Sequence, residues 1–192
     1  MVRYGALATL VLLAASISAA HGQQPLSPPA AVNDSPEVSP RGARAARDVK
    51  YGEWRKLCFN AAGAKTLCRT TITGTLATGQ TAVRVDLVER EDGTSRLQLF
   101  LPVGMYLQAG VKLSVDQRQV HRMPYSWCVS NMCIAANVAD PGPIEEMDSG
   151  KALAIEVVDT SILTVTTSVP LDRFATVRKG APTLMLDQVI DE

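Results

Sequence analysis

Short runs in which apolar and polar side chains alternate occupy most of the chain after Tyr51, and they restrict the fold more than any other feature. A period of two places successive side chains on opposite faces of a β-strand, and one apolar face per strand is typical of antiparallel sheets with one side in a core. The alternating runs are Val83–Leu87, Leu97–Leu101, Val111–Val115 and Leu153–Val157, and a Thr- and Val-rich run follows at Ile162–Ser168. The turn sequences between them are Thr78–Gln80, Glu91–Gly93, Gln108–Gly110, Asp140–Pro143 and Asp148–Gly150. These patterns predict an all-β fold, either an antiparallel β-sandwich or a partly open barrel.

Helical periodicity is confined to one short segment. Leu171, Phe174, Ala175 and Arg178 follow Pro170 at the spacing of one helix face. Proline suits the start of a helix because its missing N–H would have no partner there. We therefore expect at most one or two short helices beside the strands.

The two halves of the domain present similar elements in the same order. Each half has a Cys pair, a Gly-containing turn, two strands and a final Pro, from Cys58 to Pro102 and from Cys128 to Pro170. A duplication would make the sandwich from two related halves. Chance similarity between two hairpins is the alternative.

The first 22 residues have the features of a secretory signal peptide. Met1–Arg3 carries one positive charge, Gly5–Ile17 is apolar, and Ser18–Ala20 supplies the small residues that precede a cleavage site. About 13 apolar residues would span only about 20 Å as a helix, which is too short for a hydrocarbon core of roughly 30 Å. We expect cleavage, no transmembrane segment elsewhere, and a periplasmic protein, with outer-membrane association or secretion left open.

Composition divides the rest of the chain into three parts. Residues 23–50 contain five prolines among small and polar residues, and we expect a disordered linker there. Residues 51–180 hold the strand patterns and form the predicted domain. Residues 181–192 are expected to be a C-terminal tail.

The charge balance argues against nucleic acid as a partner. The chain has 19 Lys+Arg and 19 Asp+Glu, and loss of residues 1–22 removes only Arg3 from this count. A near-neutral chain provides no general field for gathering polyanions such as DNA or RNA. Only two histidines are present, and we predict neither a metal site nor a cofactor.

Four cysteines in an exported chain predict disulfides. Cys58 and Cys68 enclose nine residues, and Cys128 and Cys133 enclose four, so each pair would clip a local hairpin. A zinc site is the alternative, but the wider spacing does not match the usual knuckle. Two structural disulfides are therefore the prediction.

Two groups of acidic residues are candidates for the hydrolysis of an envelope polymer. They are Asp86, Glu89, Glu91 and Asp92, and then Glu145, Glu146 and Asp148. Glycoside hydrolysis needs two carboxyl groups on opposite sides of a cleft, whereas these residues are predicted to lie in polar turns. The Gly-x-Ser-x-Gly nucleophile motif is absent. We therefore predict no catalytic residue.

Large aromatic side chains lie close to both cysteine pairs. Trp54 precedes Cys58, and Trp127 directly precedes Cys128. One interpretation is an indole stacked on a disulfide in the core. The other is an exposed binding patch formed by Met123, Tyr125 and Trp127, since aromatic residues are enriched where proteins bind partners.

From about Tyr51 to Val177 the chain resembles the invasion-associated locus B (IalB) family of bacterial envelope proteins. The matching elements, in order, are Gly52-x-Trp54 with Cys58 and Cys68, Leu99–Gly104, Gly110–Asp116, Pro124-Tyr125 leading to Cys128 and Cys133, and Ser168–Phe174. Arg173 departs from the family's pattern, in which a Gly precedes the Phe, and this puts the local turn in doubt.

The resemblance implies an exported, noncatalytic, β-rich protein that acts by binding a surface or envelope partner. In pathogenic members the family is linked to virulence through invasion of host cells, so a host-cell surface is a second candidate partner. An enzyme acting on an envelope polymer and a purely structural or stress-protective periplasmic protein are the alternatives.

Overall fold

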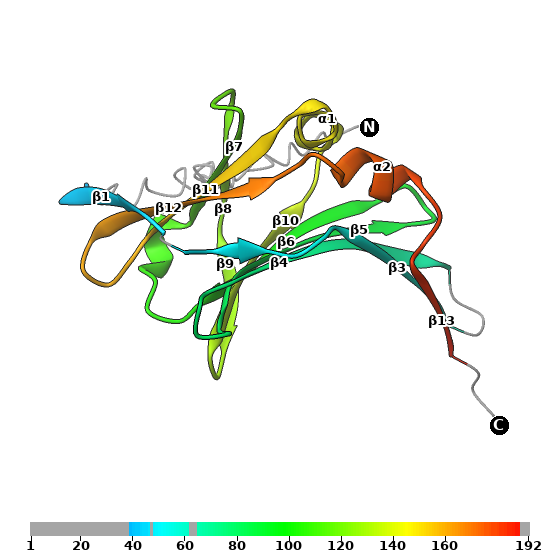
Figure 1. Ribbon diagram of the computed structural model, residues 1–192, viewed down its shortest axis with the longest axis horizontal. Coiled ribbons are helices and arrows are strands. Elements are labelled where there is room, and N and C mark those ends of the chain that lie inside the picture. Colours follow the sequence, from blue (N-terminus) through cyan, green and yellow to red (C-terminus); the bar gives the residue numbers. More distant parts are fainter. Residues whose placement is uncertain (1–38, 47, 62–64, 189–192) are drawn as a thin grey trace, which may run out of the picture. The chain divides into compact units, whose positions relative to one another are not determined.

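The computed structural model describes residues 39–46, 48–61 and 65–188, which form two β-sheets (Figure 1). The larger sheet has the spatial order β13 (Leu184–Gln188), β3 (Arg55–Ala61), β4 (Leu67–Thr75), β5 (Thr81–Arg90), β6 (Ser95–Pro102), β10 (Met132–Val138) and β9 (Tyr125–Val129), and β2 (Lys50–Tyr51) also pairs with β4. The smaller sheet has the order β1 (Gly42–Ala45), β12 (Leu163–Pro170), β11 (Ala152–Val158), β7 (Val111–Val115) and β8 (Val120–Met123). The helices are α1 (Pro141–Ser149) and α2 (Phe174–Lys179), with a 3₁₀ turn at Leu107–Ala109.

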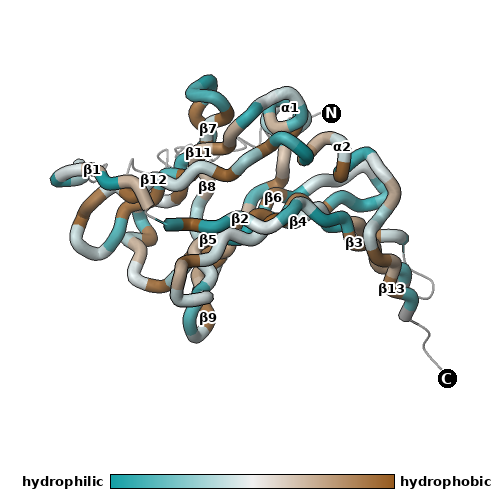
Figure 2. Tube along the Cα trace, viewed as in Figure 1, coloured by the Kyte–Doolittle hydropathy of each residue, from teal (hydrophilic) through white to brown (hydrophobic). Residues whose placement is uncertain are grey.

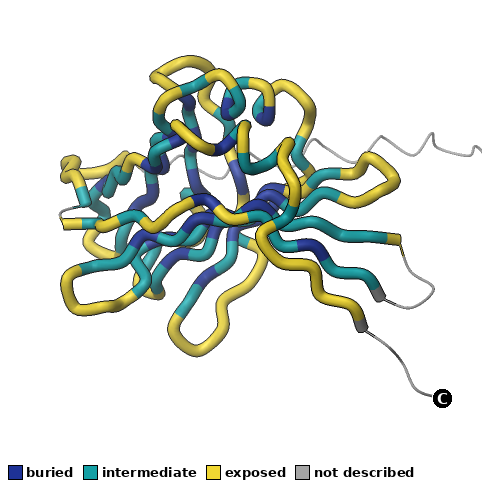
Figure 3. Tube along the Cα trace, turned by 45° about the vertical axis from the view of Figure 1, so that its right-hand side comes forward, coloured by how far each residue is buried: buried dark blue, intermediate teal, exposed yellow. Residues whose placement is uncertain are grey.

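The core lies between the two sheets. Val85 and Leu99 reach it from the larger sheet, and Val111 and Ile155 reach it from the smaller one, each nearly free of solvent exposure. Buried residues alternate with half-exposed ones along β6 and β7, and along most of β5 and β11, where Asp86 and Val158 are additional buried residues; Figure 3 shows this alternation in the strands. The predicted all-β sandwich is therefore confirmed, and the period-two pattern identified its inward faces.

The predicted short helix after Pro170 is present as α2, and its first residue, Phe174, is fully buried. The second helix, α1, begins in the segment Asp140–Pro143, for which only a turn was expected. Proline is tolerated in the first helical turn because that N–H has no intrahelical acceptor. Ile144 and Met147, three residues apart, bury one face of α1 against the core.

The sheets extend beyond the expected domain limits of 51 and 180. Strand β1 pairs in parallel with β12, with Gly42 opposite Leu163, although it falls within the expected linker. Strand β13, in the expected tail, pairs in parallel with β3. Both are edge strands held by backbone ladder bonds, which do not require an alternating side-chain pattern. The predicted signal peptide and most of the linker lie outside the described residues.

The arrangement does not repeat between the two halves. Strands β3, β4, β5 and β6 form one antiparallel meander, whereas β9–β10 and β11–β12 lie in different sheets. The element order that suggested duplication therefore does not correspond to two similar half-sandwiches. Figure 2 shows apolar segments in both sheets and a mixed, more polar character at the connecting turns.

Candidate functional site

Both predicted disulfides are present. Cys58 bonds to Cys68 across β3 and β4, and Cys128 bonds to Cys133 across β9 and β10. Each pair occupies directly opposite positions in its antiparallel ladder. The two bonds therefore hold hairpin registers and do not join distant parts of the chain.

The three residues of the predicted binding patch lie in different environments. Met123, on β8 of the smaller sheet, is only 5% exposed and belongs to the core. Tyr125 is partly buried, its hydroxyl makes no hydrogen bond to any of the described residues, and burial raises its pKa. Trp127 is 64% exposed. Met123 cannot share a surface with Trp127 because it points inward between the sheets, so the exposed part of the patch centres on Trp127.

Trp127 ends a row of large side chains that crosses the outward face of the larger sheet. The ladder registers place Arg84 opposite Phe100, Phe100 opposite Ile134, and Ile134 opposite Trp127. The Arg84 guanidinium lies 3.6 Å from the centroid of the Phe100 ring, in cation–π geometry. Val129, two residues after Trp127, is also largely exposed. The row is a mixed cationic and apolar surface that suits contact with a partner.

Trp54 lies in the core, as one interpretation of the aromatic residues expected, but it packs against an aromatic ring and not against a disulfide. Its indole is buried and packs edge-on against Phe174, with ring centroids 4.8 Å apart. Its Nε1 donates a hydrogen bond to the Pro170 carbonyl oxygen at 2.8 Å. Trp54 is thus a core residue that joins the start of the domain to α2, whereas Trp127 is not in the core.

Asp86 is the buried charge of the outward face. It was expected in a polar turn, but it lies within β5 and is 1% exposed. Its carboxylate accepts a hydrogen bond from the Thr71 hydroxyl at 2.5 Å and lies 3.3 Å from Nε of Arg84. Arg69 contributes a third, longer contact of 3.9 Å. The carboxylate therefore organises the arginines around it and is not presented to a substrate.

Arg178 joins the two groups of acidic residues that are the sequence's candidates for catalysis. It donates to Glu89 on β5 at 2.7 Å and forms a two-point contact with Asp148 on α1. Partial burial raises the pKa of Asp148, but hydrogen bonds from Arg178 and Lys179 outweigh this and lower it below the ordinary value. These carboxylates are engaged in holding α2 to its neighbours, and Glu89 was wrongly expected in a turn.

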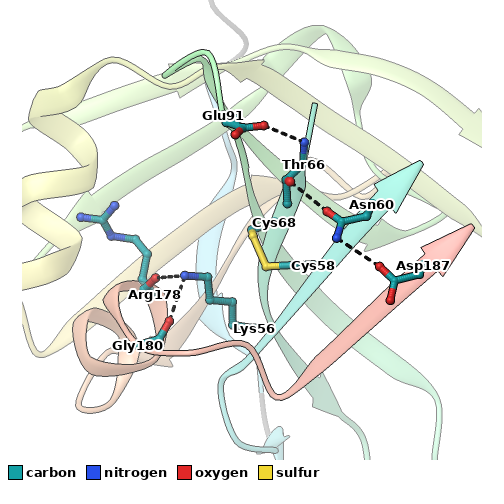
Figure 4. Close-up of a disulfide and its surroundings, with 9 residues drawn as sticks. All are labelled: Lys56, Cys58, Asn60, Thr66, Cys68, Glu91, Arg178, Gly180 and Asp187. Atoms are coloured by element: carbon teal, nitrogen blue, oxygen red, sulfur yellow. Dashed lines mark hydrogen bonds between the residues drawn. A yellow bond between two sulfur atoms is a disulfide. The ribbon is translucent and has the colours of Figure 1, made fainter. Parts of the chain in front are cut away.

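The surroundings of the Cys58–Cys68 disulfide hold the C-terminal segment in place (Figure 4). Asn60 donates to Asp187 of β13 and accepts from the Thr66 hydroxyl. On the other side, Lys56 Nζ donates to the carbonyl oxygens of Arg178 and Gly180. This network explains how a segment that looked like a tail in the sequence is attached to β3.

A pocket of about 290 Å³ lies at one end of the sandwich, between β8 and the segment before α1. His121 and Asp140 line it together with apolar side chains. His121 Nε2 lies 3.4 Å from Oε2 of Glu146. Of the acidic residues named as candidates from the sequence, Glu146 alone contacts a histidine in the described part of the chain. Across residues 39–46, 48–61 and 65–188, no group of three or more potential metal-ligating side chains comes together. Neither helix in this part has the length and apolar content that a membrane crossing needs.

Comparison with known proteins agrees with this architecture. The crystal structure of invasion associated protein B from Bartonella henselae superposes with a TM-score of 0.60 at 22% sequence identity, covering 67% of this chain and 90% of that chain. At that identity the likeness shows the fold alone. No curated protein matches the sequence. The sequence profile of the invasion associated locus B (IalB) protein family matches residues 54–182, from the buried Trp54 to the segment before β13, and the chain therefore belongs to this family.

Proposed function

We propose that this protein is exported and acts in the bacterial envelope as a noncatalytic binding protein, with Trp127 at the centre of its contact surface. The observation that carries the proposal is the 64% exposure of Trp127 beside the exposed Val129. Exposing an indole to water is unfavourable unless a partner covers it, and Trp is among the residues most enriched at binding hot spots.

Export is supported by the two disulfides and by the leader-like first 22 residues. Disulfides persist in oxidising compartments such as the periplasm and are rare in the bacterial cytosol. Periplasmic retention, association with the outer membrane and secretion all agree with this chemistry.

A binding role is favoured over polymer hydrolysis by the state of the carboxylates. Asp86 accepts a hydrogen bond from Thr71 and forms an ion pair with Arg84, and Glu89 and Asp148 both accept hydrogen bonds from Arg178. A retaining or inverting glycosidase needs two carboxyl groups that face each other across a cleft. Here the charges are used to hold strands and helices together.

The test is affinity capture with the full chain, expressed with its own leader and recovered with both disulfides formed. The bait is incubated with detergent-solubilised envelope from the source bacterium and, separately, with host-cell membranes. We expect a saturable partner that is lost with Trp127→Ala. Leu107→Ala, which truncates an exposed side chain on the 3₁₀ turn, is the matched control and should retain it.

The two extracts distinguish an envelope role from a host-directed one. Capture from the envelope alone places the partner on the bacterium, and capture from host membranes alone supports a role in invasion. Equal capture by wild type and Trp127→Ala would refute the proposed surface, and no capture from either extract would refute the binding role.

A further inference from the structure

The outward face of the four central strands of the larger sheet carries a surplus of positive charge. Strand alternation and ladder register place five arginines there: Arg55, Arg69, Arg84, Arg90 and Arg96. We call these residues the arginine face. Among the outward strand positions of β3, β4, β5 and β6, the single carboxylate is the buried Asp86, which leaves a surplus of four positive charges.

Three of these arginines line a common pocket. Arg69, Arg90 and Arg96 border a hollow of about 490 Å³ together with apolar side chains that include Phe59 and Val88. No carboxylate lines it. Arg69 and Arg96 lie opposite Val88 on its two sides, so their Cα atoms are separated by two strand spacings, roughly 9.5 Å. The Arg69 guanidinium lies 5.7 Å from the Phe59 ring centroid.

Two of the three pocket arginines have no ion-pair partner in the described part of the chain, whereas Arg69 has a long contact of 3.9 Å with Asp86. Arg90 and Arg96 are exposed, and no carboxylate there lies within ion-pair distance of either side chain. The nearby Glu91 and Asp92 accept hydrogen bonds from Thr66 and Thr94.

A second sign of an incomplete site is Arg69 itself. Its Nε is buried and has no hydrogen-bond acceptor among the described residues, although the other end of its guanidinium approaches Asp86. A buried donor without an acceptor is costly, and Arg84 Nε and Asp86 Oδ2 are likewise buried without a hydrogen-bond partner among the described residues, so Asp86 satisfies the arginines around it only in part.

The chemistry of the pocket selects the kind of molecule. A guanidinium fork matches carboxylate or phosphate oxygens with paired hydrogen bonds. The central strands are paired on both sides, so their backbone groups are used in the ladders and an extended peptide cannot add to them as a new strand. Recognition must come from side chains, and Val88 and Phe59 provide apolar surface between the cations.

We infer that the arginine face binds an anionic saccharide, a sugar chain that bears carboxylate or phosphate groups at intervals. The anionic groups pair with Arg69, Arg90 and Arg96, and the apolar faces of the sugar rings lie on the side chains between them. This inference deepens the proposed binding role and uses the same sheet face, but it depends on different residues from Trp127.

The test measures binding of the full oxidised chain to polygalacturonate and to a phosphorylated mannan by isothermal titration calorimetry. Methyl-esterified polygalacturonate and neutral mannan are the uncharged counterparts. We expect binding to the charged polymers only, with affinity that falls as salt is raised because the contacts are ionic. Arg90→Gln/Arg96→Gln should lower the affinity at least tenfold while leaving thermal unfolding unchanged, since both side chains are exposed.

The matched control is Arg118→Gln/Lys151→Gln, which removes the same charge from exposed positions in the β7–β8 turn and directly before β11, away from the arginine face. It should bind as wild type does. Equal losses in both double variants, or no binding of either charged polymer, would overturn the inference. Equally tight, Arg90- and Arg96-dependent binding of poly-glutamate would replace the saccharide with an acidic polypeptide.

The same variants separate this inference from the proposed function. If Trp127→Ala loses envelope capture but still binds polygalacturonate, the proposed contact residue and the arginine face act independently and the saccharide inference stands. If Arg90→Gln/Arg96→Gln binds polygalacturonate as wild type does while Trp127→Ala loses capture, the proposed function stands and the saccharide inference fails.

Discussion

Replacing Arg178 with Met should destabilise the domain by about 2 kcal/mol at neutral pH. The side chains of Arg178 and Asp148 are 18% and 11% exposed, and their charged atoms are 2.7 Å apart. Removing one partner of a fully buried pair costs roughly 3–5 kcal/mol, whereas an exposed pair contributes roughly 0–1 kcal/mol. This site lies between the two limits, and Lys179 still contacts Asp148 after the change.

The pH dependence of this loss follows from Asp148. Its pKa in the folded state lies below the ordinary value of 3.8, so the stability it contributes is present above that pH. That contribution is lost as the pH falls through the folded-state pKa, because protonation removes the charge in both states. The difference in free energy of unfolding between wild type and Arg178→Met should therefore have its full size at pH 7 and become smaller below about pH 4.

Urea denaturation at pH 7 and at pH 3, followed by tryptophan fluorescence, measures the loss of stability and its dependence on pH. For a domain of this size, about 2 kcal/mol corresponds to a fall in Tm of roughly 4–8 °C. Lys179→Met is the control, since its side chain is 63% exposed and contacts the same carboxylate. A loss for Lys179→Met as large as for Arg178→Met, or an unchanged difference at pH 3, would refute the reasoning.

Three further sets of variants test other parts of the structure. Tyr125→Phe removes a buried hydroxyl that makes no hydrogen bond and should stabilise the domain by up to about 1 kcal/mol in urea denaturation, so a clear loss would show that the hydroxyl is paired. Cys58→Ser/Cys68→Ser should lower the free energy of unfolding by about 3 kcal/mol and Cys128→Ser/Cys133→Ser by about 2 kcal/mol. The sequence separations are 10 and 5, and opening the larger loop returns more conformational entropy to the unfolded chain. The reverse order of the two losses would contradict this entropic account. Gly150→Ala should lower Tm because the new Cβ would collide with Val115 and with the Glu146 carbonyl oxygen, whereas Gly142→Ala, where the Cβ would meet nothing within 4 Å, should leave Tm unchanged or raise it.

Local patterns identified the elements that depend on local chemistry. Alternation found the inward faces of β5, β6, β7 and β11, and spacing found both disulfides, because strand pairing across a hairpin brings nearby cysteines into direct opposition. The same alternation left the sheet assignment open, since a strand pattern does not say which neighbour it pairs with. Strands β1 and β13 carried no alternating signal and were missed.

The candidate surface also depended on tertiary structure, because a strand pattern does not say which sheet a strand joins. The sequence indicated Trp127 as a candidate contact residue, but it also grouped Met123 with it, and only the division of β8 and β9 between two sheets turns one side chain inward and the other outward. It placed Asp86 and Glu89 in turns, whereas the long strand β5 carries both.

The sequence by itself determined the fold class, the disulfide pairs and the family, because each depends on residue types and on short spacings along one chain. Tertiary structure alone decided the arginine face, since Arg55, Arg69, Arg84, Arg90 and Arg96 come from four strands and share a surface only once the ladder registers are set. A shift of one residue in any of these registers would turn that strand's arginines toward the core.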